Sequence, residues 1–147
     1  MKRFFKVVSC LLLAAPVFAG TILLDFGNPK AASDPAAQGA LMTVRLIGCH
    51  PELLPGAMIS GTAEGLVNGK RVSAPVRLIS LATAGLYAVQ WERPAEGKWV
   101  LAFQVRVGDS TGTAIEPLGT NGFDRKPKPL NFSARGESVD TALRAAR

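Results

Sequence analysis

The fold of this chain is decided by the stretch AMISGTAEGLVNGKRVSAPVRLISL, which covers residues 57–81. Asn68-Gly69 lies at its centre, and these two residue types tolerate the positive φ angles that a two-residue type I′ turn requires. Such a turn sets Val67 opposite Lys70 and fixes every pair beyond them. Because a shift by one residue would move every side chain to the other face, the stretch predicts a β-hairpin with one defined register.

The two faces of this hairpin differ in polarity, as the register requires. One face holds apolar or small pairs, namely Ile59/Leu78, Gly61/Val76, Ala63/Ala74 and Gly65/Val72. The other face holds mostly polar pairs, namely Ser60/Arg77, Thr62/Pro75, Glu64/Ser73 and Leu66/Arg71. In this register the nitrogen of Pro75 points away from the partner strand, where its missing N–H hinders a further neighbour. We therefore expect the strand 70–81 to lie at a sheet edge near Pro75.

Further period-two segments flank the hairpin and predict more strands. The full set of expected strands is 21–26, 41–49, 57–67, 70–81, 86–92 and 98–107. We expect the last two to form a hairpin with an odd loop at 93–97, in which Gly97 adopts the left-handed conformation. This pairing sets Trp91 opposite Trp99 and Tyr87 opposite Phe103.

The aromatic residues suggest how two sheets would pack. Tyr87, Trp91, Trp99 and Phe103 are large, whereas Gly61, Ala63 and Gly65 form a lane of small residues. Rings facing small residues suit a sandwich interior, so we interpret the cluster as core. A stacking platform for a ligand is the alternative interpretation, and it would use Tyr87 or Trp91. The expected fold class is therefore an all-β, immunoglobulin-like antiparallel β-sandwich spanning residues 20–108.

The composition changes after Gly108 to Gly, Pro, Ser, Thr and charged residues. This composition predicts an irregular, flexible C-terminal tail over residues 109–147. Arg125, Lys126 and Lys128 give it a basic cluster suited to docking, and residues 138–146 are expected to form a short helix with Asp140 and Arg144 at i,i+4 spacing.

The N-terminus has the features of an export signal. Basic residues precede an apolar stretch, Pro16 follows it, and the small residues Val17 and Ala19 occupy the positions that signal peptidase reads. We expect residues 1–19 to be a cleaved signal peptide and the protein to be periplasmic or secreted. The alternative is an uncleaved membrane anchor over Val7–Leu24, a charge-free stretch at the lower length limit for a transmembrane helix.

Removal of the signal peptide lowers the net charge. The whole chain carries +6, with 17 basic and 11 acidic residues. Loss of Lys2, Arg3 and Lys6 leaves 14 basic residues against the 11 acidic ones, a net charge of +3. This balance does not indicate a nucleic-acid partner.

One pair of neighbouring residues could carry chemistry. Cys49 is followed by His50, and a thiolate with an imidazole can bind copper or zinc, to which Met42 or Met58 would add a thioether. Adjacent strand residues point to opposite faces, so joint ligation requires a turn, which Pro51 permits. The alternatives are a buried structural cysteine beside a loop histidine, and an intermolecular disulfide through Cys49. A cysteine hydrolase is disfavoured because no second histidine exists to serve as its base.

Other charged residues are interpreted as solvated. Glu64 lies on the polar face of the hairpin, and Glu92 and Glu96 flank a turn, so none of them predicts acid–base catalysis. Arg71 and Arg77 share one face, where they either keep the domain soluble or bind an anion.

Three short motifs resemble those of a known family. They are Ala74-Pro75-Val76-Arg77-Leu78, Gly85-Leu86-Tyr87 and Pro94-Ala95-Glu96-Gly97-Lys98-Trp99. With them, residues 57–107 resemble exported immunoglobulin-like modules of the YtkA/FixH-like family. The resemblance implies an accessory or binding domain at the bacterial envelope, and some such modules are associated with copper handling. This chain departs from the metal-handling members because it lacks paired histidines and Met-rich loops.

The expected function follows from these observations. We expect a non-enzymatic binding or assembly module of the cell envelope, without a cofactor and without a clear small-molecule substrate, whose partner is another envelope protein. The alternative is a metal-binding accessory protein for copper or zinc that uses Cys49, His50 and Met58.

Overall fold

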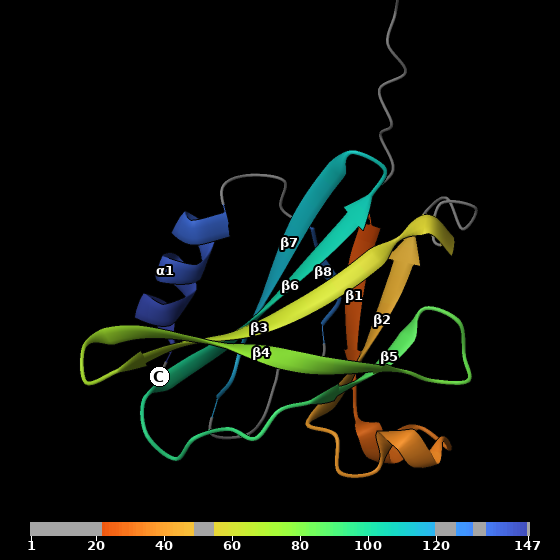
Figure 1. Cartoon of the computed structure of the whole chain (residues 1–147), viewed down its shortest axis with the longest axis horizontal. Helices are drawn as coiled ribbons and strands as arrows, with labels where there is room; N and C mark the ends of the chain where they lie inside the picture. Colours follow the sequence, from red (N-terminus) through yellow and green to blue (C-terminus); the bar gives the residue numbers. More distant parts are fainter. Residues whose placement is uncertain (1–21, 49–54, 120–125, 131–134, 147) are drawn as a thin grey trace, which may run out of the picture.

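The computed structural model describes residues 22–48, 55–119, 126–130 and 135–146 (Figure 1). Its strands are β1 (Ile22–Gly27), β2 (Met42–Gly48), β3 (Met58–Val67), β4 (Lys70–Ser80), β5 (Leu86–Gln90), β6 (Lys98–Val107), β7 (Ser110–Pro117) and β8 (Lys128–Pro129). Two short 3-10 helices, η1 (Pro29–Ala31) and η2 (Pro35–Ala37), join β1 to β2, and one α-helix, α1 (Arg135–Ala145), follows β8.

The strands form one antiparallel sheet in the order β7-β6-β3-β4-β5-β2-β1-β8. Its two end strands contact each other, and the Lys128 ammonium of β8 lies 3.3 Å from the Glu116 carboxylate of β7. The sheet is therefore nearly closed into a barrel. The all-β class is confirmed. A sandwich of two separate immunoglobulin-like sheets is not confirmed, because the pairing runs continuously through all the described strands.

The hairpin of β3 and β4 has the predicted register. Gly61 pairs with Val76, Gly65 with Val72 and Val67 with Lys70. The turn has positive φ at both central residues, 49° at Asn68 and 76° at Gly69. Both values fit the type I′ turn that the Asn-Gly dipeptide predicts.

The predicted hairpin between β5 and β6 is wrong. β5 pairs with β2 and β4, whereas β6 pairs with β3 along most of its length and with β7 on its other side. Period-two alternation indicates which face of a sheet a residue occupies, but it does not indicate which strand lies beside it. The pattern therefore fits a hairpin of two strands that are consecutive in sequence as well as it fits the observed pairing. Gly97 does have the expected left-handed φ, at 89°. Trp91 and Trp99 also meet, with ring centroids 5.1 Å apart.

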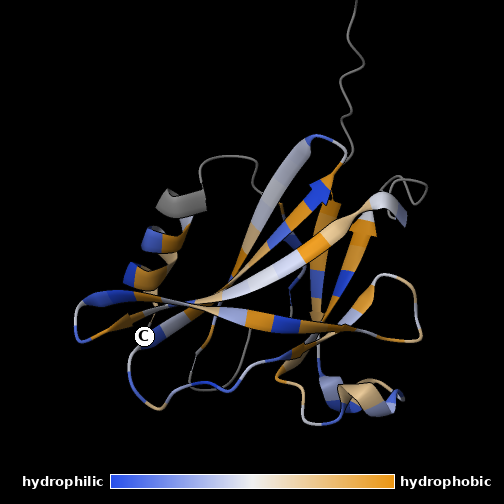
Figure 2. Cartoon of the chain, in the orientation of Figure 1, coloured by the Kyte–Doolittle hydropathy of each residue, from blue (hydrophilic) through white to orange (hydrophobic). Residues whose placement is uncertain are grey.

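The core fills the inside of the curved sheet with alternate side chains. Its fully buried members include Leu24, Phe26, Met42, Val44, Val89, Leu101 and Phe103. Figure 2 shows β1, β2 and β6 as mainly hydrophobic strands interrupted by hydrophilic bands. The small lane of β3 does face large rings, but these belong to the adjacent strand: Gly61 pairs with Phe103 and Gly65 with Trp99. The predicted packing across two sheets is thereby corrected to packing between neighbouring strands.

The C-terminal part is more regular than its composition predicts. β7 pairs with β6 from Ser110 to Pro117, so the sheet extends beyond the expected boundary at residue 108. Small residues such as Gly112 and Ala114 lie on its inner face, and they weakened the strand signal. A helix does occupy the expected C-terminal position, and it packs on the outer side of the sheet through an apolar cluster of Val100, Ala102, Val139, Leu143 and Ala146.

The signal peptide at residues 1–19 lies outside the described residues. Within the described part of the chain, no helix is long and apolar enough to cross a membrane.

Candidate functional site: the open edge of strand β4

Strand β4 is longer than the neighbour that pairs with it on one side. Its ladder with β5 covers only Arg77–Ser80, and the Leu81 N–H extends it by donating to the Leu86 carbonyl oxygen at 2.9 Å. The next position, Pro75, has no N–H to offer on that side, and β5 ends at Gln90. Residues 70–76 of β4 thus have β3 as their one strand partner among the described residues. We call this segment the open edge.

The open edge is accessible to solvent. Residues 70–73 and Pro75 are exposed, as are residues 92–98 of the connection that follows β5. Val72 is 40% exposed, and in the described chain only two other large hydrophobic residues, Ile47 and Met58, are similarly exposed. Pairing in the hairpin alternates, so Val72 and Ala74 direct their backbone groups to β3, whereas Arg71 and Ser73 direct theirs outward.

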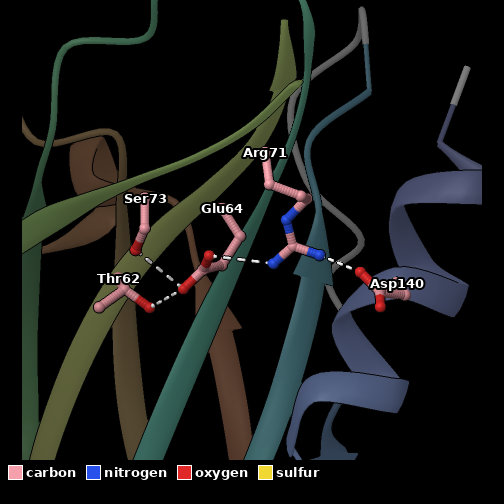
Figure 3. Close-up of polar contacts among 5 residues, drawn as sticks. All are labelled: Thr62, Glu64, Arg71, Ser73 and Asp140. Carbon is pink, nitrogen blue, oxygen red and sulfur yellow. Dashed lines mark hydrogen bonds and ion pairs between the residues drawn. The ribbon is translucent and has the colours of Figure 1, made fainter. Parts of the chain in front are cut away.

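A polar network lies beside this edge, on the outer face of the sheet (Figure 3). The Glu64 carboxylate of β3 accepts hydrogen bonds from the hydroxyls of Thr62, at 2.8 Å, and Ser73, at 3.1 Å. Arg71 donates to the same carboxylate at 3.2 Å. Glu64 is only 7% exposed, which corrects the expectation that it is solvated. Its burial is tolerated because these donors compensate for the lost water.

Arg71 also links the sheet to the helix. One guanidinium nitrogen is bonded to Glu64 and the other to Asp140 of α1 (Figure 3). This arrangement weakens the interpretation of Arg71 and Arg77 as an anion site, since the charge of Arg71 is already balanced by two carboxylates. We call Thr62, Glu64, Arg71, Ser73 and Asp140 together the Glu64 network.

A surface hollow of about 420 Å³ opens at this place, and we call it the edge hollow. Its lining is Glu64, Arg71, Val72, Ser73 and Asp140. Two carboxylates and one guanidinium give the lining a net charge of −1. The Asp140 side chain is 52% exposed and the Glu64 side chain 9%, so Asp140 presents most of the accessible negative charge.

A second hollow, of about 630 Å³, lies between the 3-10 segment and the turn from β4 to β5. Asp34 joins these two segments: it caps η2 by accepting from the Ala36 N–H at 2.9 Å, and it accepts from the Ala82 N–H at 2.8 Å. These two backbone donors, that of Ala82 first, stabilise the ionised carboxylate and hold the pKa of Asp34 below its ordinary value. Asp34 therefore fixes the shape of the hollow and is not a free acid or base.

Two of the predicted metal ligands are described. Met42 is fully buried in the core at the start of β2, which rules it out as a ligand beside Met58, and Met58 is 56% exposed at the start of β3. Its sulfur accepts a hydrogen bond from the Arg106 guanidinium at 3.5 Å, so a cation lies where a metal ion would have to approach. Cys49 and His50 lie outside the described residues. In the part of the chain that is described, no three His, Cys, Asp or Glu side chains gather as a metal ion would need.

Sequence reasoning missed a buried charge inside the sheet. Glu116 of β7 pairs with Leu101 and is fully buried, next to Lys128 of β8. Glu116 lies on the inner face because it alternates with Gly112 and Ala114 along the strand. The sequence would predict this position if residues 110–117 were recognised as a strand. The Glu116–Lys128 ion pair joins the two ends of the sheet.

Comparisons with protein-family models, with curated proteins and with solved structures found no match to this chain.

Proposed function

We propose that the protein is a non-enzymatic binding or assembly module of the cell envelope, exported by a cleaved signal peptide at residues 1–19 and periplasmic or secreted. Its partner is another envelope protein. The proposal includes a relation to exported immunoglobulin-like modules, which rests on the motifs at residues 74–78, 85–87 and 94–99. The observation that carries it is the open edge of β4, an exposed strand with an exposed valine beside a charged hollow.

The polar side chains support this proposal because they serve the fold. Glu64 accepts from Thr62, Ser73 and Arg71, Glu116 pairs with Lys128, and Asp34 accepts from the backbone N–H groups of Ala36 and Ala82. A catalytic acid or base must instead reach a substrate with a matched pKa, usually next to a nucleophile or a second ionisable group. These three carboxylates, together with Asp140 on Arg71, are thus engaged in holding strands, a helix and turns together.

A metal-binding accessory function is the second candidate. The exposed thioether of Met58 favours it, since soft sulfur ligands select Cu(I), and Cys49 with His50 would complete the set. Binding would require Met58 to release Arg106. Thermal unfolding with and without Cu(I) or Zn(II) tests this candidate. A rise in Tm that disappears in a Cys49→Ser, His50→Ala variant supports metal binding, and an equal rise in both proteins contradicts it.

The main proposal is tested with the full chain expressed with a C-terminal tag in a Gram-negative host. We expect an N-terminus at Gly20 in the periplasmic or secreted fraction, and one envelope protein that co-purifies in fixed stoichiometry and retrieves this chain when it is itself tagged. An unprocessed protein in the cytosol would contradict export. A specific substrate turnover by the purified protein, lost on a single substitution, would contradict the non-enzymatic assignment.

A further inference from the structure

We propose that the open edge of β4 binds an extended segment of the partner by strand addition, and that the segment carries apolar side chains at alternate positions with a lysine or arginine among those between them. This inference rests on the proposed function, because it states where and how such a module would hold its partner.

The backbone of the open edge supplies the hydrogen bonds. Arg71 and Ser73 occupy non-hydrogen-bonded positions of the hairpin, so their N–H and C=O groups point away from β3. The Pro75 carbonyl points the same way. The ladder to β5 begins beyond Pro75, with Arg77 opposite Gln90. Within the described ranges, no other strand pairs with the outward backbone groups of residues 71–75. An added strand can therefore pair there, and β5 stops it at one end, which limits the bound segment to a few residues.

The side chains of the open edge determine which positions of the bound segment should be apolar and which polar. Val72 lies on the inner face of the hairpin, yet it is 40% exposed, and Ala74 beside it is half-buried. A neighbouring strand would place its own inward side chains against these two, so apolar residues at those positions would cover Val72. The outward side chains of the added strand would lie next to Arg71 and Ser73, over the edge hollow.

The charge of the edge hollow selects the outward side chain. Glu64 and Asp140 outweigh Arg71, and Asp140 is the more accessible of the two acids. A lysine or arginine of the partner that reaches Asp140 is attracted by its carboxylate, whereas a glutamate at the same position is repelled by it. The sequence feature expected of the partner segment is thus a basic residue between two apolar residues.

The probe is the synthetic peptide acetyl-Thr-Val-Lys-Val-Thr-Val-Thr-amide, titrated into the isotopically labelled chain and followed by amide NMR shifts. We expect the shifts to centre on Arg71 and Ser73. The same peptide N-methylated at its lysine and its middle threonine, the residues whose N–H groups face Ser73 and Arg71 in an antiparallel ladder, cannot complete the ladder and should not bind. A peptide with glutamate in place of lysine should bind several-fold more weakly.

Ser73 offers a matched pair of variants. Ser73→Pro removes an outward N–H and leaves the hydrogen bonds to β3 intact, as Pro75 already does two residues away. Ser73→Ala loses the same hydroxyl contact with Glu64 but keeps the N–H. We expect about tenfold weaker peptide binding in Ser73→Pro and little change in Ser73→Ala. Far-UV circular dichroism and Tm of both variants establish that each is folded.

The outcomes separate the inference from the proposed function. Equal binding by both Ser73 variants, or shifts centred elsewhere, would overturn the strand-addition site. Retention of the co-purified envelope protein by a folded Ser73→Pro variant would overturn the site and leave the binding function standing. If sedimentation shows a wild-type dimer that Ser73→Pro dissociates, the occupant is a second copy of this chain and the proposed partner is wrong.

Discussion

Gly65 of β3 lies directly beside Trp99 of β6, so close that a Cβ atom on Gly65 would stand 2.5 Å from the indole ring. The ring occupies the space above the glycine and covers its backbone, and the Trp99 Nε1–H donates to the Glu96 carbonyl oxygen at 2.8 Å. The Trp99 side chain is thereby held by the packing of its ring on Gly65 and by the hydrogen bond of its Nε1–H. These two contacts position the start of β6 and the connection from β5.

Gly65→Ala is expected to destabilise the protein by about 1–3 kcal/mol, because the methyl group displaces a ring that is held in place. Urea unfolding monitored by tryptophan fluorescence measures the change. Gly61→Ala is the control: its Cβ would meet Phe103 at 3.4 Å, so we expect a change below about 1 kcal/mol. Equal effects of the two substitutions would contradict the close contact with Trp99.

Arg71→Ala is expected to cost about 1–2 kcal/mol, because it removes a charged donor from the nearly buried Glu64 carboxylate. Asp140→Asn removes only the solvent-exposed ion pair between Arg71 and Asp140, and it should cost less than about 1 kcal/mol of stability. Chemical denaturation of both variants provides the comparison. A larger loss for Asp140→Asn than for Arg71→Ala would mean that the helix contact, and not the Glu64 carboxylate, dominates the network.

Leu143→Ala is expected to destabilise the protein by about 2–4 kcal/mol, since the side chain is buried between α1 and the outer face of β6. Thermal unfolding gives the magnitude, and increased binding of a hydrophobic dye would report the exposed sheet surface. Substitution of the neighbouring exposed Arg144 by alanine serves as a control with little expected effect. An equally small effect of Leu143→Ala would show that α1 does not contribute to the fold.

Asp34 should make stability depend on pH in the acidic range. Its folded pKa lies below the ordinary value of 3.8, so it contributes stability that is fully present above that value and is lost as the pH falls through the folded pKa. Asp34→Asn removes this contribution. The difference in urea midpoint between wild type and variant should therefore be constant at neutral pH and shrink below about pH 4. A difference that grows on acidification would have the opposite sign and contradict the assignment.

The hairpin of β3 and β4 was predictable from the sequence because its information is local. Asn68-Gly69 sets the turn, and the alternation on both sides sets the register. The edge position of Pro75 followed from the same register, since the side on which a proline nitrogen points is fixed by its place in the ladder. These features require no knowledge of distant residues.

The partners of the other strands were not predictable in the same way. Trp91 and Trp99 meet, but through the curvature of the sheet and not as a cross-strand pair, and alternation alone does not distinguish these arrangements. Arg71 joins Glu64 to Asp140 of α1, which is distant in sequence and lies in the region whose composition predicts an irregular tail. The Glu64 network was therefore missed, although its hairpin register was correct.

Backbone amide hydrogen exchange of the free protein tests most directly whether the edge of β4 is open. Val72 and Ala74, whose N–H groups face β3, should exchange slowly. Arg71 and Ser73, whose N–H groups face outward, should exchange close to the rate of an unstructured chain. Protection of Arg71 and Ser73 equal to that of Val72 and Ala74 would show that the edge is already occupied, and would contradict its use as the docking strand.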